Sequence, residues 1–470
     1  MDGVVLGDRL NDALLLLVLV CFAYSALVLS RFFVYWLAVS RAYHRRQPDP
    51  SGDQAAYDWH VFVPCRDEEA VVHDTLDALR TGFPACHVWL IDDASEDRTL
   101  ALAERYAHAD DRVHLVARQL PRARIGKGAA LNSAYQQLSS WLPVSADRSR
   151  VVVAVVDADG RLAGGALAHV AGALADPAVG AAQIGVRMRN ADDPRPRPDR
   201  GRLGNAWARL LVRTQDVEFS VNNAGMQLLR RRTGSVGLGG NGQFVRLTAL
   251  DSLAGTQLRP WSQRALLEDY ESGLELLLNG WQVTHLHDTY VTQEATASAR
   301  RFLAQRTRWA QGNLHCLSYT GRVVRSTRLP WLGKAEILYT FLQPVAAVTL
   351  TVTTPLCLLI PLLTHDAPDN ALYTRTMDGL ADHMTLLLLV PVVFGVLPLM
   401  AWGLRYRRDR CPGRGLLAGL VWGLAMWLYA YHLFVVSTRG AVRIVLGREG
   451  WAKTRRNAEA IGVGPVAKEV

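Results

Sequence analysis

Long apolar runs stand towards both ends of the chain, and a charged region lies between them. The runs extend from Leu14 to Val39, from Ile337 to Leu363, from Met384 to Trp402 and from Leu416 to Val436. Each approaches or exceeds the roughly 20 apolar residues with which a helix crosses a bilayer. We therefore expect membrane-spanning helices in these runs, with buried helices of a soluble core as the alternative.

Between residues 55 and 300 the pattern changes to short apolar runs that alternate with amphipathic stretches. The runs in "WHVFVPC", "CHVWLIDD" and "RVVVAVVDAD" are typical of buried strands, and "GKGAALNSAYQQL" is a glycine loop that opens a helix. Buried strands that alternate with helices predict a largely parallel, three-layer α/β sheet. In such a sheet ligands bind beyond the carboxyl ends of the strands, so the acids that follow these runs are expected to meet at one edge.

These patterns divide the chain into five segments. They are an N-terminal membrane helix with its juxtamembrane linker, the α/β domain, interfacial helices, C-terminal membrane helices and a basic tail. Their predicted ranges are 1–54, 55–300, 301–334, 335–437 and 438–470.

The charges between the runs predict an orientation. Arg41, Arg45 and Arg46 follow the first run, so the positive-inside rule puts the α/β domain in the cytoplasm. The acidic segment between the second and third runs is expected outside, and the basic connection "RYRRDRCPGR" inside. Three spans after a cytoplasmic domain would leave the basic tail outside, unless 337–363 is a broken or re-entrant pair. The side of the tail stays open.

The net charge of +9 raises the question of an anionic partner. We find no nucleic-acid-binding motif, and many arginines stand beside the apolar runs. This placement favours anionic lipid headgroups of a bilayer over nucleic acid. The six cysteines are scattered without a Cys-x-x-Cys pair, which argues against zinc or redox chemistry.

Two aspartates follow the apolar run "VVVAVV". Asp157 and Asp159 are spaced i, i+2 at the expected strand end. Mg²⁺ and Mn²⁺ prefer oxygen ligands and commonly keep substrate phosphates among them. The pair therefore indicates a metal site that holds a sugar nucleotide, with a surface turn as the alternative.

Other charged residues stand at corresponding positions. Asp92 and Asp93 follow "VWLI", and Glu68 follows the first strand. Such carboxylates can accept hydrogen bonds from a nucleobase or a ribose, or they can simply complement a helix N-terminus. Lys127 lies between two glycines, where backbone and ammonium can meet a phosphate. An exposed loop lysine is the alternative there.

Glu268 and Asp269 begin an amphipathic helix in "LLEDYESGLELLLNGW". Transfer of a sugar to a hydroxyl requires a group that takes the proton, and Asp269 is our candidate for this general base. The alternative is an acidic first helical turn.

The stretch "FLAQRTRWAQGN" places Gln305, Arg308 and Trp309 at i, i+3 and i+4, on one face of a helix. The guanidinium of Arg308 can bind a diphosphate with two hydrogen bonds. The indole of Trp309 offers an apolar plate for a sugar ring. An interfacial helix with a Trp-Arg anchor is the alternative.

Seven motifs occur in the order "VPCRDEE", "IDDASED", "GKGAALN", "DAD", "GGNGQF", "LED" and "QRTRW". Over residues 55 to 315 this order resembles the inverting family 2 glycosyltransferases of GT-A fold. It resembles most the membrane-embedded branch with cellulose, chitin, hyaluronan and poly-N-acetylglucosamine synthases. Leu267 stands where the family has threonine, and "GGNGQF" replaces the acceptor-pocket sequence of relatives. "GREGWAKTRR" near the tail resembles a tail element of several relatives.

The resemblance implies roles for the matching residues. Asp92 or Asp93 would contact the nucleoside together with Glu68, Asp157 and Asp159 would bind diphosphate and metal, and Asp269 would be the base. The expected enzyme is a multi-pass cell-membrane glycosyltransferase with a cytoplasmic catalytic domain, which uses Mg²⁺ or Mn²⁺ and takes UDP-glucose or UDP-N-acetylglucosamine as its donor.

The product stays open between two expectations. A β-linked polysaccharide is favoured by "QRTRW", which accompanies processive synthesis in relatives. A glycolipid made on a membrane lipid is favoured by the small number of spans. A catalytically inactive, nucleotide-binding membrane subunit is the alternative of another class.

Overall fold

A computed structural model describes residues 2–363 and 392–448. At its centre lies an eight-stranded sheet with the order β3-β2-β1-β4-β7-β6-β8-β5. The strands are β1 (Asp58–Cys65), β2 (His87–Asp93), β3 (Val113–Arg118), β4 (Val151–Val155), β5 (Arg161–Leu162), β6 (Val179–Met188), β7 (Gln243–Arg246) and β8 (Gln282–Gln293).

The sheet is mixed, with one reversed strand in its middle, β7, and another at its end, β5, which is antiparallel to β8. Strands β1 to β4 are mutually parallel, and β6 is parallel to β8. Strand β7 runs antiparallel to both of its neighbours, β4 and β6. The sequence predicted a largely parallel sheet because the short run "QFVR" carries no sign of its direction. The reversal leaves the carboxyl ends of β1, β2, β4, β6 and β8 at the same edge.

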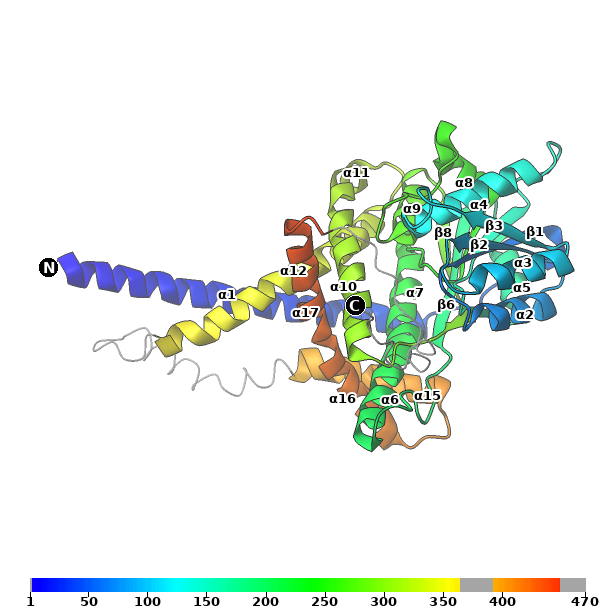
Figure 1. Cartoon of the computed structure of the whole chain (residues 1–470). Coiled ribbons are helices and arrows are strands. Elements are labelled where there is room, and N and C mark those ends of the chain that lie inside the picture. The colour runs from blue at the N-terminus through cyan, green and yellow to red at the C-terminus, as the bar shows by residue number, and fades with distance from the viewer. Residues whose placement is uncertain (1, 364–391, 449–470) are drawn as a thin grey trace, which may run out of the picture.

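Helices cover both faces of this sheet, which confirms the three-layer α/β architecture (Figure 1). One face packs against α2 (Val72–Gly82), α3 (Thr99–Ala109) and α5 (Ala166–Leu174). The other packs against α4 (Lys127–Trp141), α8 (Leu247–Ala254) and α9 (Glu268–Leu278). Strands buried on both faces explain the unbroken apolar runs, because neither set of side chains meets water.

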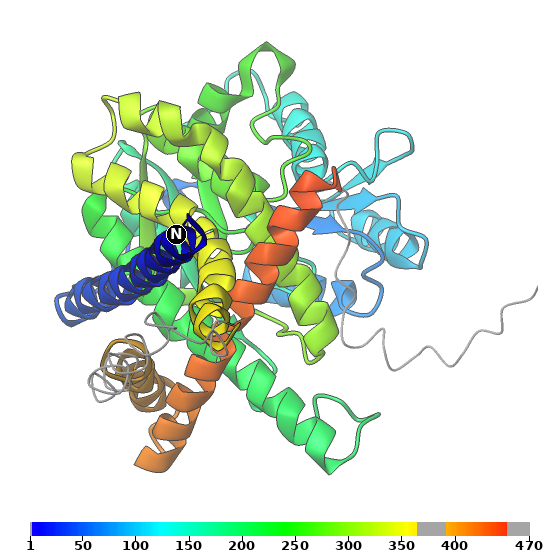
Figure 2. The ribbon, with the colours of Figure 1, turned by 90° about the vertical axis from the view of Figure 1, so that its left-hand side faces the viewer.

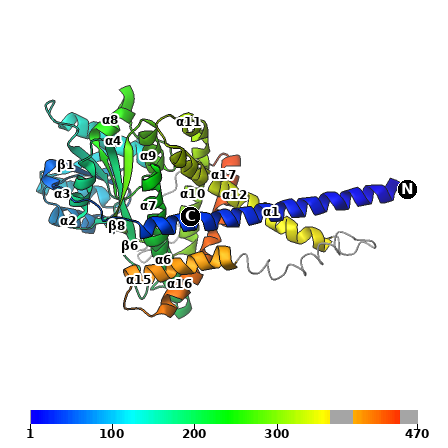
Figure 3. The same ribbon diagram turned by 180° about the vertical axis from the view of Figure 1, so that it is seen from behind.

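The remaining helices gather on one side of the sheet domain, and α1 projects from it (Figures 1 and 3). They are α1 (Asp2–His44), α6 (Arg202–Val217), the π-helix η2 (Glu218–Asn223), α7 (Ala224–Thr233), α10 (Ala299–His315), α11 (Thr320–Arg325), α12 (Trp331–Leu363), the π-helix η5 (Val392–Val396), α15 (Leu397–Arg410), α16 (Leu416–Ala430) and α17 (His432–Val445).

Helix α12 lies against α1, as the view along α1 in Figure 2 shows. The rings of Tyr35 and Tyr339 stack with their centroids 4.4 Å apart. Farther along the pair, the hydroxyls of Tyr24 and Thr349 lie 2.6 Å apart. These two contacts fix α12 along α1.

Within the described residues, two helical segments are long and apolar enough to cross a membrane by length and composition, Trp331–Thr353 and Leu416–Val445. The first apolar run of the sequence forms part of α1. Part of the run from Met384 to Trp402, the acidic segment before it and most of the basic tail lie outside the described residues. The domain ranges and the sidedness of the membrane stay predictions.

Candidate functional site

The acids that follow the strands lie at one edge of the sheet, together with the first turns of α4 and α9. Strand register pairs Cys65 with Asp92, and β1 lies directly between β2 and β4. The ends of these three strands therefore bring Glu68, Asp92 and Asp157 to the same edge. This is the juxtaposition that the alternating pattern predicted.

Lys127 is the centre of a charged cluster at this edge. Its Nζ donates to Oδ1 of Asp157 at 2.6 Å and to the carbonyl of Gly240 at 2.7 Å. The glycine after it allows a close crossing of the chain: a Cβ on Gly128 would lie 2.2 Å from the carbonyl oxygen of Ser262 and 3.3 Å from Cβ of Glu268. The crossing segment therefore brings the start of α9 beside the start of α4.

Gly240 closes the cluster on the other side. A Cβ at this position would lie 3.1 Å from Nζ of Lys127 and 3.2 Å from Oδ2 of Asp269. The cation, the candidate base and the backbone of the "GGNGQF" loop thus converge on one point. Sequence reasoning had assigned no residue of this loop to the site.

Gln183, on β6, holds this loop in place. Its Oε1 accepts from the amide of Gly239 at 2.7 Å, and its Nε2 donates to the carbonyl of Asn241 at 2.9 Å. The side chain of Asn241 in turn accepts from the amide of Asp157 at 3.2 Å. Sequence reasoning missed Gln183, although a glutamine inside the apolar run "VGAAQIGV" was a visible signal.

Burial shapes the protonation of the two acids on α9. Burial and the neighbouring Asp269 raise the pKa of Glu268 to about 7, against the charges of Lys127 and Arg308. Burial also raises the pKa of Asp269, while Lys127 works to lower it. A carboxylate with a raised pKa is a stronger base, because it holds a proton more tightly.

The two cations respond to the same acids. Burial works to lower the pKa of Lys127, but Asp157, Glu268 and Asp269 outweigh it, so the pKa is raised. Burial lowers the pKa of Arg308, and the same three acids oppose this shift. The structure therefore brings Arg308 into the field of the cluster, and its guanidinium remains charged.

Asp157 and Asp159 differ in their surroundings. The side chain of Asp157 is 31% exposed where it meets Lys127. Asp159 is buried, and its Oδ2 accepts from the amide of Glu294 at 2.8 Å. Among the described residues no group of three or more His, Cys, Asp or Glu side chains is arranged to hold a metal. The two carboxylates fit Mg²⁺ or Mn²⁺ only as part of a shell that substrate phosphates complete.

The three carboxylates predicted to bind the nucleoside, those of Glu68, Asp92 and Asp93, also differ in their surroundings. Asp93 accepts from the guanidinium of Arg118 and from the amide of Arg124, so its carboxylate is engaged in a buried ion pair. Oδ1 of the buried Asp92 has no hydrogen-bond partner within the described part of the chain, and burial raises the pKa of this acid. Glu68 is also buried. Asp92 is thus the better placed of the two aspartates.

Helix α10 carries Gln305, Arg308 and Trp309. The guanidinium carbon of Arg306 lies 4.4 Å from the ring centroid of Trp309. The ring of Phe219, on η2, meets the indole edge-on with centroids 6.3 Å apart. Trp309 is therefore held by protein contacts and is half-buried, which restricts the indole surface it can offer to a sugar.

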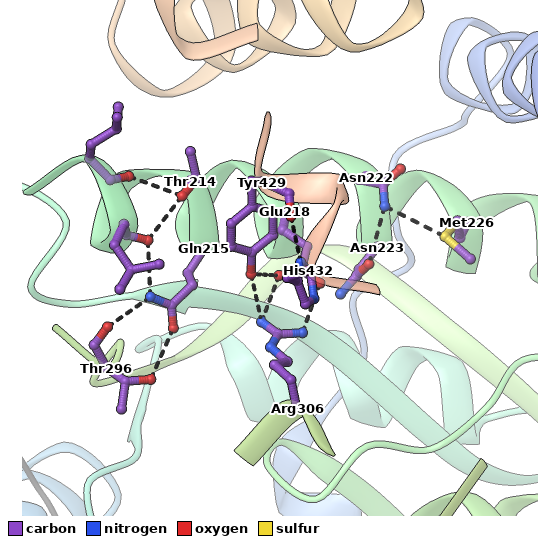
Figure 4. A network of polar contacts seen from close by, with 12 residues as sticks. Thr214, Gln215, Glu218, Asn222, Asn223, Met226, Thr296, Arg306, Tyr429 and His432 are labelled. Atoms are coloured by element: carbon purple, nitrogen blue, oxygen red, sulfur yellow. Dashed lines mark hydrogen bonds and ion pairs between the residues drawn. The ribbon is translucent and has the colours of Figure 1, made fainter. Parts of the chain in front are cut away.

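A buried network anchors α10 to other helices (Figure 4). Arg306 donates to both carboxylate oxygens of Glu218, at 2.8 and 2.6 Å. The hydroxyl of Tyr429, on α16, donates to Glu218 at 2.6 Å and accepts from Arg306 at 3.1 Å. Sequence reasoning missed this arginine, which stands inside "QRTRW" one helical turn before Trp309. Glu218 begins η2, and π-helical turns are frequent at functional sites.

Helix α17 also packs on α10, in addition to η2 and α16. A Cβ on Gly440 would lie 3.0 Å from the backbone nitrogen of Gln311. The side chain of Gln311 donates to the carbonyl of Arg448 at 2.9 Å and accepts from Arg443 at 2.8 Å. Helix α10 is thus fixed between η2, α16 and α17 while it presents Arg308 to the acids.

Comparison with known sequences gives consistent matches. The family described as "Glycosyltransferase like family 2" matches residues 58–312, more than half of the chain. A beta-monoglucosyldiacylglycerol synthase from Trichormus variabilis is 30% identical over 296 residues, 61% of this chain and 56% of the relative. A beta-monoglucosyldiacylglycerol synthase from Synechocystis sp. is 27% identical over 420 residues, 85% of this chain and 74% of the relative. The chain thus matches little more than half the length of the first of these relatives.

Among solved structures, the mannosyltransferase PcManGT from Pyrobaculum calidifontis, in complex with GDP-Man and Mn²⁺, has a similar fold. The match covers 92% of this chain and 99% of that chain, with a TM-score of 0.56 and 17% sequence identity. At this identity the likeness shows a shared fold over nearly the whole of both chains.

Proposed function

The chain belongs to the family 2 glycosyltransferases, and from this premise we propose that it is a glycolipid synthase that glycosylates a membrane lipid. It is a glycosyltransferase of GT-A fold, so the inactive-subunit alternative is set aside. The observation that carries the proposal is the convergence of Lys127, Asp157, Asp269 and Arg308 beside helices of membrane-spanning length.

The sequence favoured a polysaccharide as the product, but the similar proteins support the alternative, a glycolipid. Two similar sequences carry the name beta-monoglucosyldiacylglycerol synthase, and one of them aligns over 85% of this chain. That name supports a diacylglycerol acceptor and a glucosyl donor for the proposed reaction. We retain UDP-glucose as the donor to test first.

In the proposed reaction Asp269 accepts the proton of the lipid hydroxyl while the hydroxyl oxygen attacks the anomeric carbon of the sugar. The new carbon–oxygen bond forms on the face opposite the leaving nucleoside diphosphate, so the anomeric configuration inverts. The bond to the diphosphate breaks, and its electron pair leaves with the diphosphate. Arg308 stabilises the charge that develops there, because two parallel N–H donors match phosphate oxygens.

Asp157 and Asp159 would hold the divalent cation, whose contribution when bound is to neutralise the diphosphate. Lys127 contacts Asp157 and would add a second positive charge near the leaving group. The role of Lys127 thus extends beyond the phosphate contact expected from the sequence, because it also fixes the carbonyl of Gly240.

The raised pKa of Asp269 suits a base that must take a proton from an alcohol. Glu268, next to Asp269, has a pKa of about 7, so at neutral pH it can act as a second proton acceptor. Asp92 with Glu68 is proposed to bind the nucleoside, and Gln305 and Trp309 to contact the sugar or the acceptor. Asp93 is proposed to shape the pocket through Arg118 and Arg124.

The product of the reaction decides between the two candidate functions. The full-length protein in vesicles that contain diacylglycerol is incubated with UDP-[¹⁴C]glucose, Mg²⁺ or Mn²⁺, and the mixture is extracted with organic solvent. We expect the label in the organic phase as a single glycolipid, and none with the Asp269→Asn variant. Label that stays in an ethanol-insoluble aqueous fraction would instead identify a polymer and overturn the glycolipid proposal.

A further inference from the structure

A second charged cluster lies away from the catalytic acids, where α6 meets α15 and α16. Its centre is Asp216, the last acid of α6, which is fully buried. The Asp216 carboxylate accepts from the amide of Met188 at 2.7 Å, the hydroxyl of Ser220 at 3.1 Å and the hydroxyl of Tyr406 at 2.5 Å. Three neutral donors therefore already occupy this carboxylate.

Arginines from three different elements lie around this acid, and Arg410 forms a long ion pair with it. Arg410 ends α15, and its nearest contact with Asp216 is 4.0 Å, beyond hydrogen-bond distance. Arg213 donates to the Tyr406 hydroxyl at 3.0 Å and pairs with Asp192, whose side chain is 81% exposed. Arg187, on β6, lies 3.6 Å from the ring centroid of Tyr290.

The positive charge of this cluster exceeds the negative charge available to it. Within residues 2–363 and 392–448, neither Arg187 nor Arg410 forms a hydrogen bond to a carboxylate, and Nε of Arg410 is buried without a partner. Burial and the charge of Arg410 lower the pKa of Arg187, so the two guanidiniums repel each other. Like charges at half-buried positions are costly unless an anion joins them.

We infer that Arg187, Arg213 and Arg410 form a binding site for the phosphate of an anionic membrane-lipid headgroup. Guanidinium groups bind phosphate oxygens through paired N–H donors, and two or three of them can share one phosphate. The site is separate from the predicted donor site, which is built on Asp157, Asp159 and Arg308.

The surroundings identify a lipid as the source of this phosphate. Arg410 stands a short turn before α16, which is part of the membrane-span candidate Leu416–Val445. Trp422 of α16 lies 5.3 Å from the guanidinium of Arg213. On α6, the side chains of Leu203 and Trp207 are 88% and 62% exposed. Tryptophan and arginine at the end of a span are typical of the level of the lipid headgroups. The exposed apolar side chains can contact the acyl chains of a lipid, whereas free phosphate has no apolar part to contact them.

The test is a binding measurement on the full-length protein in neutral detergent. The probe is short-chain phosphatidylglycerol, and short-chain phosphatidylcholine and sodium phosphate are titrated separately. We expect phosphatidylglycerol to bind much more tightly than either. Each of Arg187→Gln and Arg410→Gln should weaken its binding about fivefold, and the double variant about 25-fold.

Arg414→Gln is the matched control, because it removes the same charge from an exposed position in the connection that follows α15. It should bind phosphatidylglycerol within about twofold of the wild type. Unchanged binding by the double variant would overturn the site, and equally tight binding of sodium phosphate would overturn the lipid source. If the double variant fails to fold, the two single variants give the same test. The measurement needs no turnover, so its failure is distinct from failure of the proposed enzyme activity.

Discussion

The two edges of the central sheet treat buried charge in opposite ways. At the carboxyl edge, Lys127 and Arg308 stay charged among three acids. At the other edge, His60, His87 and His114 form a row across β1, β2 and β3, with ring centroids 5.1 Å apart at each step. Nδ1 of His87 lies 2.9 Å from Nε2 of His114, and the row also meets Asp58, 3.1 Å from Nε2 of His60, and Arg112, 3.3 Å from Nε2 of His87.

The pKa values express this difference. Burial and the neighbouring His60 lower the pKa of His87 to about 4, so the ring is neutral at physiological pH. Burial and Asp269 raise the pKa of Glu268 to about 7, close to physiological pH. At one edge burial thus lowers the pKa of His87 and His114 and favours their neutral rings, and at the other edge buried acids and cations share one cluster. The comparison teaches that burial alone does not indicate a site: at the candidate site, several buried acids share two cations instead of forming closed pairs.

The largest expected effect comes from removal of the candidate base. Asp269→Asn removes the proton acceptor with little change in volume, so turnover should fall by about 10²–10⁴-fold while nucleotide binding remains. His87→Asn, at the opposite edge, should leave turnover within about twofold. Both are measured as release of UDP from UDP-glucose, with UDP binding followed by calorimetry. Comparable losses in the two variants would contradict the assignment of catalysis to one edge.

The next effect concerns the buried ion pair that fixes α10 to η2. Arg306→Gln leaves the carboxylate of Glu218 buried without its cation, so the free energy of unfolding should fall by about 3–5 kcal/mol. The exposed pair of Arg322 and Glu275 is the matched control, and Arg322→Gln should cost about 1 kcal/mol or less. Thermal unfolding of both variants in detergent tests this, and equal losses would refute the distinction.

A smaller effect is expected from Gly240→Ala. The added methyl group would enter the space between Nζ of Lys127 and Oδ2 of Asp269, so turnover should fall about 10- to 100-fold with unchanged thermal stability. Gly164→Ala, where a Cβ meets nothing within 4 Å, should change neither quantity. A fully active Gly240→Ala variant would show that the lysine and the base need no such open space.

The smallest effect is a difference in the pH dependence of stability. The raised pKa of Glu268 stabilises the fold below pH 4.5, and this contribution is lost as the pH rises to about 7. The lowered pKa of His87 acts in the opposite direction: its contribution is present above pH 6.5 and is lost as the pH falls to about 4.

Between pH 4.5 and 6.5 the two groups therefore give opposite slopes, each at most about 1.4 kcal/mol per pH unit. Relative to the wild type, Glu268→Gln should make the melting temperature rise more steeply with pH, and His87→Asn should make it rise less steeply. Melting temperatures of both variants across this range provide the check. Parallel curves for wild type and variants would contradict the two shifts.

Local patterns of the sequence predicted the arrangement of the strands and their terminal acids. Apolar runs that end in Asp92 and Asp157 carry that information within a few residues. The direction of β7 could not be predicted in this way, because it depends on where the preceding helices return the chain. The roles of Gly240 and Gln183 likewise depend on contacts between residues more than 50 positions apart.

The same limit applies to the charged side chains. The sequence placed Asp93 and Lys127 correctly at the edge of the sheet, but it could not show that Arg118 engages Asp93 or that Gly240 accepts from Lys127. Partner choice among the many arginines is decided by packing, as the pair of Arg306 and Glu218 illustrates. Sequence periodicity therefore predicts which residues reach a site more reliably than which partners they find there.

The close approach of α17 to α10 at Gly440 has a practical consequence for recombinant production. A fragment trimmed after residue 325, designed to be water-soluble, would retain every acid of the candidate site. It would also strip α10 of the neighbours that support Gln311 and Arg306. Such a truncation is expected to yield protein that precipitates or loses turnover, so expression screens should preserve the chain through Arg448.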